Sequence, residues 1–325
     1  MKVIQFREAL REAMSEEMRL DNNVFLMGEE VAEYNGAYKV SNGMLDEFGS
    51  NRVIDTPISE LGFAGLGVGA AMNNLRPIIE FMTFNFSLVA IDQIINSASK
   101  IRFMSGGQFS ISIVFRGPTG SAGMLASQHS QNFENWYANC PGLKVVVPSN
   151  PYDAKGLLKS SIRDNDPVIF MESEIMYEDL GKIPFDDYLI EIGKPIIRKR
   201  GKDLTLVSFG KMMKIGIDVA LEMEEFGIDI ELIDMRTVRP LNLDYIINSV
   251  KKTNHILIIE ESWPLGSISS EITYQVQKHA FNSLNYPVQK INNLDIPFPY
   301  SPNLAKEVLP NIEKTIEVIN NMFNL

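Results

Sequence analysis

The sequence predicts an α/β protein of two layered domains, each with a mainly parallel sheet. Three observations lead to this class. Along nearly the whole chain, short apolar segments alternate with segments whose apolar residues have helical spacing. This pattern is interrupted between Tyr177 and Ile192 by a stretch rich in Pro, Gly and Asp. The length of 325 residues suggests about two domains. Alternating strands and helices are typical of layered α/β domains. We therefore expect a first domain over residues 1–178, a linker over 179–195 and a second domain over 196–325.

The elements of the first domain follow from local patterns. Residues 1–21 have the charge-rich, amphipathic spacing of a helix, and residues 87–104 repeat apolar side chains at helical spacing until Gly106 and Gly107 end the pattern. The intervening apolar runs predict short strands, and a further helix is expected before a polar turn. The strands are expected at NVFLMG, NRVIDT, RPIIEF, ISIVFRG, LKVVVP and PVIFMES, and the helix at PYDAKGLLKSSIRDND.

The second domain repeats the alternation with its own set of strands and helices. Four apolar runs predict strands, and four segments of helical spacing lie between and after them. The strands are expected at DLTLVSFG, DIELIDMRTV, HILIIEE and YPVQKIN, and the helices near residues 212–226, 243–252, 268–281 and 311–323.

Composition argues against several classes of protein. A formal net charge of −11 is unlike a nucleic-acid-binding surface, which is basic. The longest apolar runs are too short to span a bilayer, so we expect no membrane segment. Cys140 is the only cysteine, which rules out an intrachain disulfide and favours a buried structural thiol. Because the chain begins at Met1 without an Arg/Ser-rich presequence, we expect a bacterial, cytoplasmic protein.

One segment stands out, from Asp55 to Phe86. Between Asp55 and Arg76 its only charged side chain is Glu60. Thr56 and Pro57 have the residue types of an N-cap and a first helical position, and the following GFAGLGVGAAM predicts a buried helix. The carboxylate at the start of this helix has two interpretations. It complements the helix dipole, or it shares a proton with a base bound in apolar surroundings.

A dinucleotide-binding oxidoreductase is the main alternative enzyme class. Residues 65–70 satisfy G-x-G-x-x-A, and Glu80 follows at a distance suited to a ribose-binding acid. The fingerprint glycines must, however, form the turn that directly follows a strand. Ten residues and a helix start separate Asp55 from Gly65, so these glycines are expected inside a helix. P-loop, nucleophile-elbow and HExxH patterns are absent from the sequence.

Ordered blocks from about Phe6 to Pro310 resemble a known family. The blocks are DTPISELGFAGLGVGAA, RPIIEFMTFNF, AIDQIINSASKIRFMSGG, IVFRGPTG, QHSQNFENWYANCPGLKVVVPSNPYDAKGLLKSSIRDNDP and MRTVRPL. Together they resemble the beta subunits of pyruvate dehydrogenase, the thiamine-diphosphate-dependent first component of the 2-oxo-acid dehydrogenase complexes. The resemblance implies a thiamine diphosphate pyrimidine-binding domain followed by a transketolase C-terminal-like domain.

The resemblance assigns roles to residues of the central segment. It implies that Glu60 contacts the aminopyrimidine ring of thiamine diphosphate and protonates its ring nitrogen, so that pyruvate is decarboxylated and its acyl group passes to lipoamide. Phe86 aligns with the aromatic side chain that stacks on this ring, and Met82 and Ile58 are expected beside it. His129 aligns with a residue at the entrance to the site, where it touches substrate or the lipoyl group. Without the resemblance, Phe86 is equally well a core aromatic.

A second site is implied in the turn SSIRDNDP. It resembles the potassium loop of the family, which binds the ion largely through backbone carbonyls. Asp166 stands where Asn is more usual, and the ion is expected to be structural. Taken without the resemblance, Asp-Asn-Asp-Pro is an ordinary helix-ending turn. The implied ligands are Ile113, Ser161, Ile162, Asp164 and Asp166.

The diphosphate end of the cofactor has no recognisable motif in this chain. Thiamine diphosphate enzymes hold magnesium and diphosphate with a GDG motif, which the sequence lacks. The resemblance therefore implies that magnesium ligands lie on a pyruvate dehydrogenase alpha subunit, in an assembly of two alpha and two beta chains. It also implies docking to the subunit-binding and lipoyl domains of dihydrolipoyl acetyltransferase. A branched-chain 2-oxo-acid or acetoin dehydrogenase beta subunit, or a non-catalytic scaffold, are the remaining alternatives.

Overall fold

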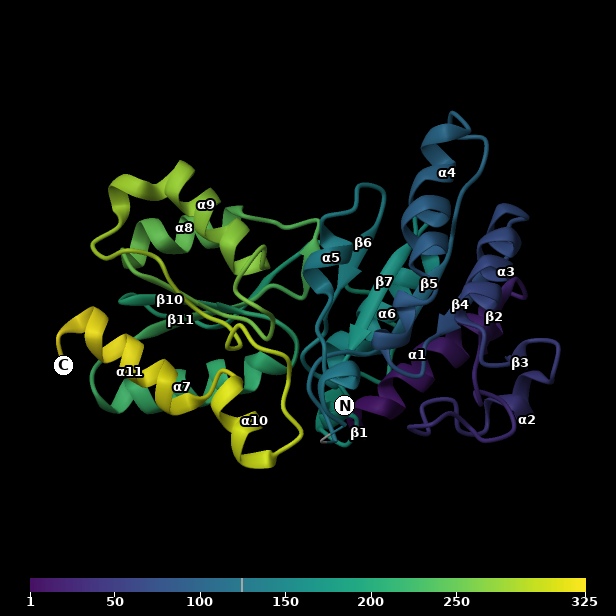
Figure 1. Ribbon diagram of the computed structural model, residues 1–325, viewed down its shortest axis with the longest axis horizontal. Coiled ribbons are helices and arrows are strands. Elements are labelled where there is room, and N and C mark those ends of the chain that lie inside the picture. Colours follow the sequence, from purple (N-terminus) through teal and green to yellow (C-terminus); the bar gives the residue numbers. More distant parts are fainter. Residues whose placement is uncertain (124) are drawn as a thin grey trace.

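The computed structural model describes residues 1–123 and 125–325, which form two lobes side by side, each an α/β sandwich (Figure 1). The first lobe is built on a seven-stranded sheet of order β12-β6-β7-β5-β4-β2-β3. All neighbours in it are parallel except β12 and β6. The strands are β2 (Val24–Gly28), β3 (Val53–Asp55), β4 (Arg76–Glu80), β5 (Val114–Pro118), β6 (Lys144–Val146), β7 (Val168–Glu172) and β12 (Thr237–Arg239).

Helices cover both faces of this sheet. The helix α1 packs against α6, and their buried faces share a core with Val24, Ile78 and Phe170 of the sheet. On the other face, α3 packs on β4, and its buried Phe63 and Val68 belong to a second core cluster. The helices are α1 (Phe6–Leu20), α2 (Met44–Phe48), α3 (Glu60–Met72), α4 (Ser99–Met104), α5 (Glu134–Ala138) and α6 (Pro151–Arg163).

The second lobe has a five-stranded sheet of order β14-β13-β10-β11-β9, parallel except for β9. Figure 1 shows α8 and α9 on one face of this sheet and α7 and α11 on the other. The strands are β9 (Ile196–Lys199), β10 (Leu204–Ser208), β11 (Ile230–Asp234), β13 (Ile256–Ile259) and β14 (Gln289–Ile291). The helices are α7 (Met213–Glu225), α8 (Asp244–Thr253), α9 (Ile268–Ala280), α10 (Pro302–Val308) and α11 (Ile312–Phe323).

The expected fold class and the four expected strands and helices of the second lobe are confirmed, and the remaining differences have tertiary causes. The strand β1 (Lys2–Gln5) precedes α1 and pairs antiparallel with β8 (Leu180–Ile183), so part of the expected linker is a strand beside the first lobe. The strand β12 comes from the second half of the sequence but extends the first sheet. The sequence analysis missed β1, β8, β9, β12, α5 and α10. The domain boundaries 1–178, 179–195 and 196–325 stay a prediction.

The expected start of the helix after Asp55 is wrong. The helix α3 begins at Glu60, with Ser59 as its N-cap, so Thr56 and Pro57 are not helical. The reason is that the Thr56 amide still donates to the Gly28 carbonyl and continues the strand pairing. The rejection of a dinucleotide fingerprint is confirmed, because residues 65–70 lie inside α3.

The helix α3 is buried on one face only, which corrects the expectation of a fully buried helix. Gly67 packs so closely on the sheet that a Cβ there would lie 2.7 Å from Cδ1 of Ile79. On the opposite face, Leu66 keeps 69% of its surface exposed, and Leu61 and Gly69 are also exposed. An apolar helix with an exposed apolar face is typical of a surface that a partner covers. Within the described residues, no helix is long and apolar enough to cross a membrane.

Two glycines of α3 provide a matched test of this packing. Gly67→Leu forces a side chain into the contact with Ile79 and should lower the free energy of unfolding by ~1–3 kcal/mol. Gly69→Leu gains the same helix propensity, but no atom lies within 4 Å of the added Cβ, so it should leave the free energy of unfolding unchanged or raise it by up to ~1 kcal/mol. Denaturant titration of the folded chain measures both values. Equal destabilisation by the two substitutions would contradict the packing of α3 on β4.

Candidate functional site

The carboxyl ends of the parallel strands of the first sheet meet at one edge. Gly28 at the end of β2 pairs with Glu80 at the end of β4, and Pro118 at the end of β5 pairs with Glu172 at the end of β7. In open α/β sheets, ligands bind beyond the carboxyl ends of the strands. The side chains that follow these strand ends are therefore the candidates for a site.

A buried ion cluster ties three of these strands together. The guanidinium of Arg116 donates two hydrogen bonds of 2.6 Å to the carboxylate of Glu172 and also pairs with Glu80. The hydroxyl of Tyr177 donates to Glu172 at 2.8 Å. Burial raises the pKa of Glu80, while its ion pair with Arg116 acts in the opposite direction. Glu80 is therefore held by Arg116, which contradicts its alternative role as a ribose-binding acid.

Glu60 lies at the first residue of α3 and is 6% exposed. Its neighbour across this edge is Glu29, which follows β2 and is 5% exposed. Burial, and then the negative charge of Glu60, raise the pKa of Glu29 to about 7. Two carboxyl groups that share a buried site hold a proton between them near neutral pH. The arrangement is suited to passing a proton to a bound base.

Two buried oxygen atoms beside Glu60 have no hydrogen-bond partner within the described part of the chain. They are Oε1 of Glu29 and Oγ1 of Thr56. Buried polar atoms are nearly always hydrogen-bonded in folded proteins, so an unpaired group calls for an explanation. A ligand with polar ring substituents, seated against the start of α3, would satisfy them. This is the observation by which the site fits the aminopyrimidine of thiamine diphosphate.

The structure brings Phe86 and His129 together. Phe86 lies in the short 3₁₀ helix Phe84–Leu88 and His129 in the turn Ser127–His129, and their rings meet edge to face with centroids 5.3 Å apart. Both side chains are half-buried. Phe86 is therefore not a fully buried core aromatic.

The described contacts join Glu60 to the Phe86–His129 pair only indirectly. The rings of Phe63 and Phe81 lie 5.9 Å apart and those of Phe81 and Phe84 lie 5.6 Å apart, which links α3 to the 3₁₀ helix that carries Phe86. Met82, half-buried, follows β4, and Ile58 precedes α3 with 85% of its surface exposed. The roles expected for these residues toward a cofactor stay a prediction.

The turn expected to bind potassium is held by cationic side chains. The guanidinium of Arg76 donates to the backbone carbonyls of Ile162, at 2.9 Å, and Asp164, at 3.1 Å. The carboxylate of Asp164 pairs with Lys144 at 2.6 Å, and Asp166 pairs with Arg102.

The other two expected ligands are engaged as well. The Ile113 carbonyl accepts from the Val168 amide, and the Ser161 hydroxyl donates to the Leu157 carbonyl. Within the described residues, no group of three or more His, Cys, Asp or Glu side chains is placed to hold a metal ion. The potassium site rests on backbone carbonyls and stays a prediction.

Two residues of the site were missed by the sequence analysis. Glu29 received no role there, and Arg116 appeared only within the expected strand ISIVFRG. A signal existed for both. Glu29 directly follows a strand end, and Arg116 is a lone charge within the buried run VFRGP, which requires buried partners.

Two family models match the chain and define its class. The transketolase pyrimidine-binding domain matches residues 2–179, and the transketolase C-terminal domain matches residues 193–315. A solved structure described as a split-gene transketolase, an inactive beta4 tetramer, superposes with a TM-score of 0.79. The alignment has 17% sequence identity and covers 98% of this chain and 97% of the other, which shows the shared fold. The chain is a two-domain protein of the transketolase type.

Curated relatives define the family more narrowly. The pyruvate dehydrogenase E1 component subunit beta of Rhizobium meliloti is 55% identical over 98% of this chain and 70% of its own length. The corresponding subunit of Rickettsia felis is 50% identical over 97% of both chains, and the mitochondrial subunit of Caenorhabditis elegans is 47% identical over 98% and 92%. The chain belongs to the family of pyruvate dehydrogenase E1 beta subunits.

The paired carboxyl groups make stability depend on pH. Because the pKa of Glu29 is raised to about 7, the folded chain binds this proton more tightly than the unfolded chain, whose value is near 4.5. The stabilising contribution is therefore full below the unfolded value and is lost as pH rises through about 7. Glu29→Gln should remove this part of the pH dependence of the free energy of unfolding.

The control is Glu30→Gln, which changes the exposed neighbour of Glu29 in the same turn. Denaturant titrations of wild type and both variants across weakly acidic to neutral pH measure the slopes. A Glu29→Gln variant with the slope of the wild type would contradict the pairing of Glu29 with Glu60.

Proposed function

We propose that this chain is the beta subunit of a pyruvate dehydrogenase, which with an alpha subunit decarboxylates pyruvate oxidatively and transfers the acetyl group to lipoamide. The observation that carries the proposal is the buried Glu60–Glu29 pair at the start of α3, where Oε1 of Glu29 and Oγ1 of Thr56 have no hydrogen-bond partner within the described residues. It lies in the segment matched by the pyrimidine-binding family model. The names of the curated relatives support pyruvate over branched-chain 2-oxo acids or acetoin.

The residues of this chain would bind and protonate the pyrimidine end of thiamine diphosphate. Glu60 would contact a ring nitrogen from the start of α3 and donate a proton to it, and Glu29, whose pKa is raised to about 7, would return a proton to Glu60. Phe86 offers a half-buried ring face against which a planar ring would pack. His129, whose ring meets that of Phe86, would contact substrate or the lipoyl group. When bound, the cofactor supplies the carbon nucleophile for the 2-oxo group and the electron sink for loss of CO₂.

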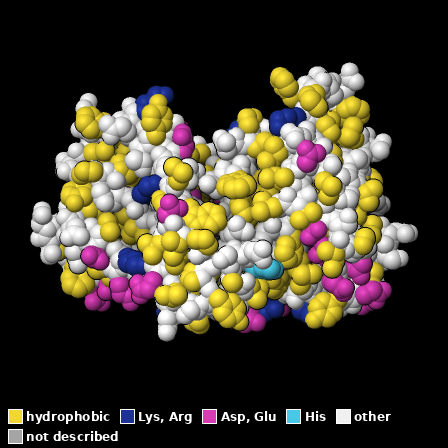
Figure 2. Space-filling model, viewed as in Figure 1, with side chains coloured by type: hydrophobic (Ala, Val, Ile, Leu, Met, Phe, Trp, Pro, Cys, Tyr) yellow, Lys and Arg dark blue, Asp and Glu magenta, His cyan; other side chains and the backbone are white. Residues whose placement is uncertain are grey.

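The diphosphate end would be held by an alpha subunit. This sequence contains no GDG motif, and magnesium ligands are accordingly assigned to the partner. The exposed apolar face of α3, with Leu61 and Leu66, supports a protein partner at this point. A second apolar surface is formed by Phe103 and Met104, which are exposed at the end of α4. This end of α4 projects from the first lobe (Figure 1), and hydrophobic side chains are visible on the projection in Figure 2. We assign an assembly of two alpha and two beta chains to these surfaces.

The turn after α6 would add a structural potassium ion. The carbonyl oxygens of Ile162 and Asp164 each accept from Arg76 and retain a second lone pair. The carbonyl oxygens of Ile113, Ser161 and Asp166 complete the proposed ligand set. Docking to the subunit-binding and lipoyl domains of an acyltransferase belongs to the same proposal and rests on the family.

Glu60→Gln tests the acid. It keeps the shape of the side chain but cannot transfer the proton, so pyruvate decarboxylation by the assembled enzyme should fall by ~10²–10⁴. That range corresponds to about 3–5 kcal/mol of activation free energy. Steady-state kinetics with the alpha subunit present measures the change, and thermal unfolding of the assembly checks that it stays intact. Rates within about twofold of wild type would remove Glu60 from the mechanism.

The shared cofactor site gives a second prediction. Purified alone, the chain should bind no thiamine diphosphate tightly and decarboxylate no pyruvate even with magnesium. The physical reason is that Glu60 and Phe86 hold one end of the cofactor, whereas the diphosphate and its metal carry most of the charge. Calorimetry on the isolated, folded chain is the measurement, and adding the alpha subunit should restore binding and activity together. Tight magnesium-dependent binding by the isolated chain would contradict the shared site.

A further inference from the structure

His129 lies in a long loop between β5 and α5, and the base of this loop is closed within the first lobe. The Thr119 amide donates to the Glu172 carbonyl, and the Gly120 amide donates to the Gln131 carbonyl, both at 2.9 Å. The first bond ties the start of the loop to β7, and the second joins its two ends. Two residues after His129, the Gln131 amide also donates to Oδ1 of Asn85 at 3.1 Å. The part of the loop before His129 is held by further contacts.

The second lobe supplies those contacts from the carboxyl edge of its own sheet. Lys211 follows β10 and Glu261 follows β13, and their charged groups pair at 2.5 Å with both side chains buried. Lys211 Nζ also donates to the carbonyl of Ser121 at 2.6 Å and to its hydroxyl at 2.7 Å. The Ser121 amide donates to Glu261 Oε1 at 2.7 Å. The Lys211–Glu261 ion pair is thus hydrogen-bonded to the amide, the carbonyl and the hydroxyl of Ser121.

The fit leaves no room for a larger residue at the preceding position. Gly120 has φ +77°, a left-handed conformation that glycine adopts without strain, and a Cβ there would lie 2.6 Å from Oε2 of Glu261. Further along the loop, the Ser127 hydroxyl donates to the Phe298 carbonyl of the second lobe at 2.7 Å. The second lobe therefore holds the loop at Ser121 and again at Ser127, two residues before His129.

We propose that Lys211 and Glu261 are positioning residues: through Ser121 they set the loop that presents His129 beside Phe86. This inference rests on the proposed function for the role of His129. It means that residues of the second lobe help to shape the candidate site in the first lobe. The pair does not touch substrate or cofactor. A buried ion pair is weak evidence for stability, because desolvation offsets its attraction, whereas its directed hydrogen bonds fix geometry.

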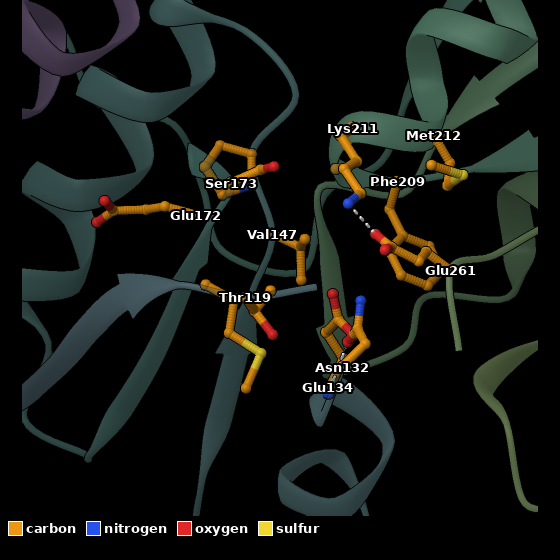
Figure 3. Close-up of a pocket in the computed structure, with 13 residues that line it drawn as sticks. Thr119, Asn132, Glu134, Val147, Glu172, Ser173, Phe209, Lys211, Met212 and Glu261 are labelled. Carbon is orange, nitrogen blue, oxygen red and sulfur yellow. Dashed lines mark hydrogen bonds and ion pairs between the residues drawn. The ribbon is translucent and has the colours of Figure 1, made fainter. Parts of the chain in front are cut away.

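The surroundings keep this ion pair intact. Figure 3 shows Lys211 and Glu261 joined beside a small cavity, with Glu134 and Asn132 directed toward them from the first lobe. Burial, and then the charges of Glu260 and Glu261, raise the pKa of Glu134 well above its ordinary value. A protonated Glu134 does not compete with Glu261 for Lys211. The cavity, of about 20 Å³, has room for one water molecule that would serve the unpaired Oε2 of Glu134.

The test uses the enzyme assembled with its alpha subunit and three substitutions. Lys211→Met removes the cation, and Glu261→Gln keeps an acceptor for the Ser121 amide but removes the charge. Lys214→Met is the matched control, because it breaks a nearby ion pair of 2.6 Å with Asp179 that does not touch the loop.

Two readouts are compared in each assembly. Hydrogen–deuterium exchange of residues 119–131 reports the position of the loop directly. Acetyl transfer to a lipoyl domain is compared with pyruvate decarboxylation driven by an artificial electron acceptor. The comparison separates a loss of contact between His129 and the lipoyl group from a loss of cofactor chemistry.

Lys211→Met and Glu261→Gln should each raise exchange of residues 119–131 by about tenfold or more, since they remove charge-assisted hydrogen bonds to the loop. Acetyl transfer should fall by about tenfold more than decarboxylation. Lys211→Arg keeps the cation, so its loop exchange and its acetyl transfer should lie between those of Lys211→Met and wild type. Lys214→Met should leave both readouts at the wild-type level.

Unchanged exchange in residues 119–131, or a rise shared equally by the whole chain, would overturn the inference. So would an equal loss of both half-reactions in variants with a loosened loop. If the wild-type assembly does not act on pyruvate, the proposed function fails separately, and the exchange of the loop alone decides whether Lys211 and Glu261 position it.

Discussion

The first lobe depends on one buried charge, the guanidinium of Arg116. It joins the ends of β4, β5 and β7 by pairing with Glu80 and Glu172, with both carboxylates withdrawn from water. Removing one partner of such a cluster leaves an uncompensated buried charge, which typically costs about 3–5 kcal/mol. The strand ends it joins set the start of the loop that carries His129 and the turn that carries Met82. The ion pairs of Arg116 therefore hold the carboxyl ends of β4, β5 and β7 together at the edge of the sheet that carries the candidate site.

The two lobes are joined by more than the chain that connects them. The strand β12 crosses from the second half of the sequence to pair with β6 of the first sheet. Buried charges also span the interface: Asp153 on α6 pairs with Arg236 at 2.7 Å. Sheet hydrogen bonds and buried ion pairs therefore connect the second half of the sequence to the first lobe.

Two apolar parts of the first lobe are exposed at the surface of the chain. The apolar face of α3 and the end of α4 are exposed, while the acid at the start of α3 is buried. A helix with one face packed on β4 and the other open to solvent is suited to an assembly in which a second chain covers it. In the proposed function, the half of the site on this chain would handle protons and aromatic packing, and the charged half would lie on the partner.

The sequence by itself determined the alternation of strands and helices and the two-lobe class, because these depend on local periodicity. It also singled out Glu60 as a lone charge in an apolar segment, and the role of that residue stays a prediction. Its family resemblance also selected Phe86 and His129, whose rings do meet. It could not place the start of α3, which strand pairing at Thr56 delays to Glu60, nor the crossing of β12. The Glu29–Glu60 pair, the partners of Arg116 and the Lys211–Glu261 bridge were decided by tertiary structure alone. Each joins residues far apart in sequence, and only the folded sheets bring their charges within contact distance.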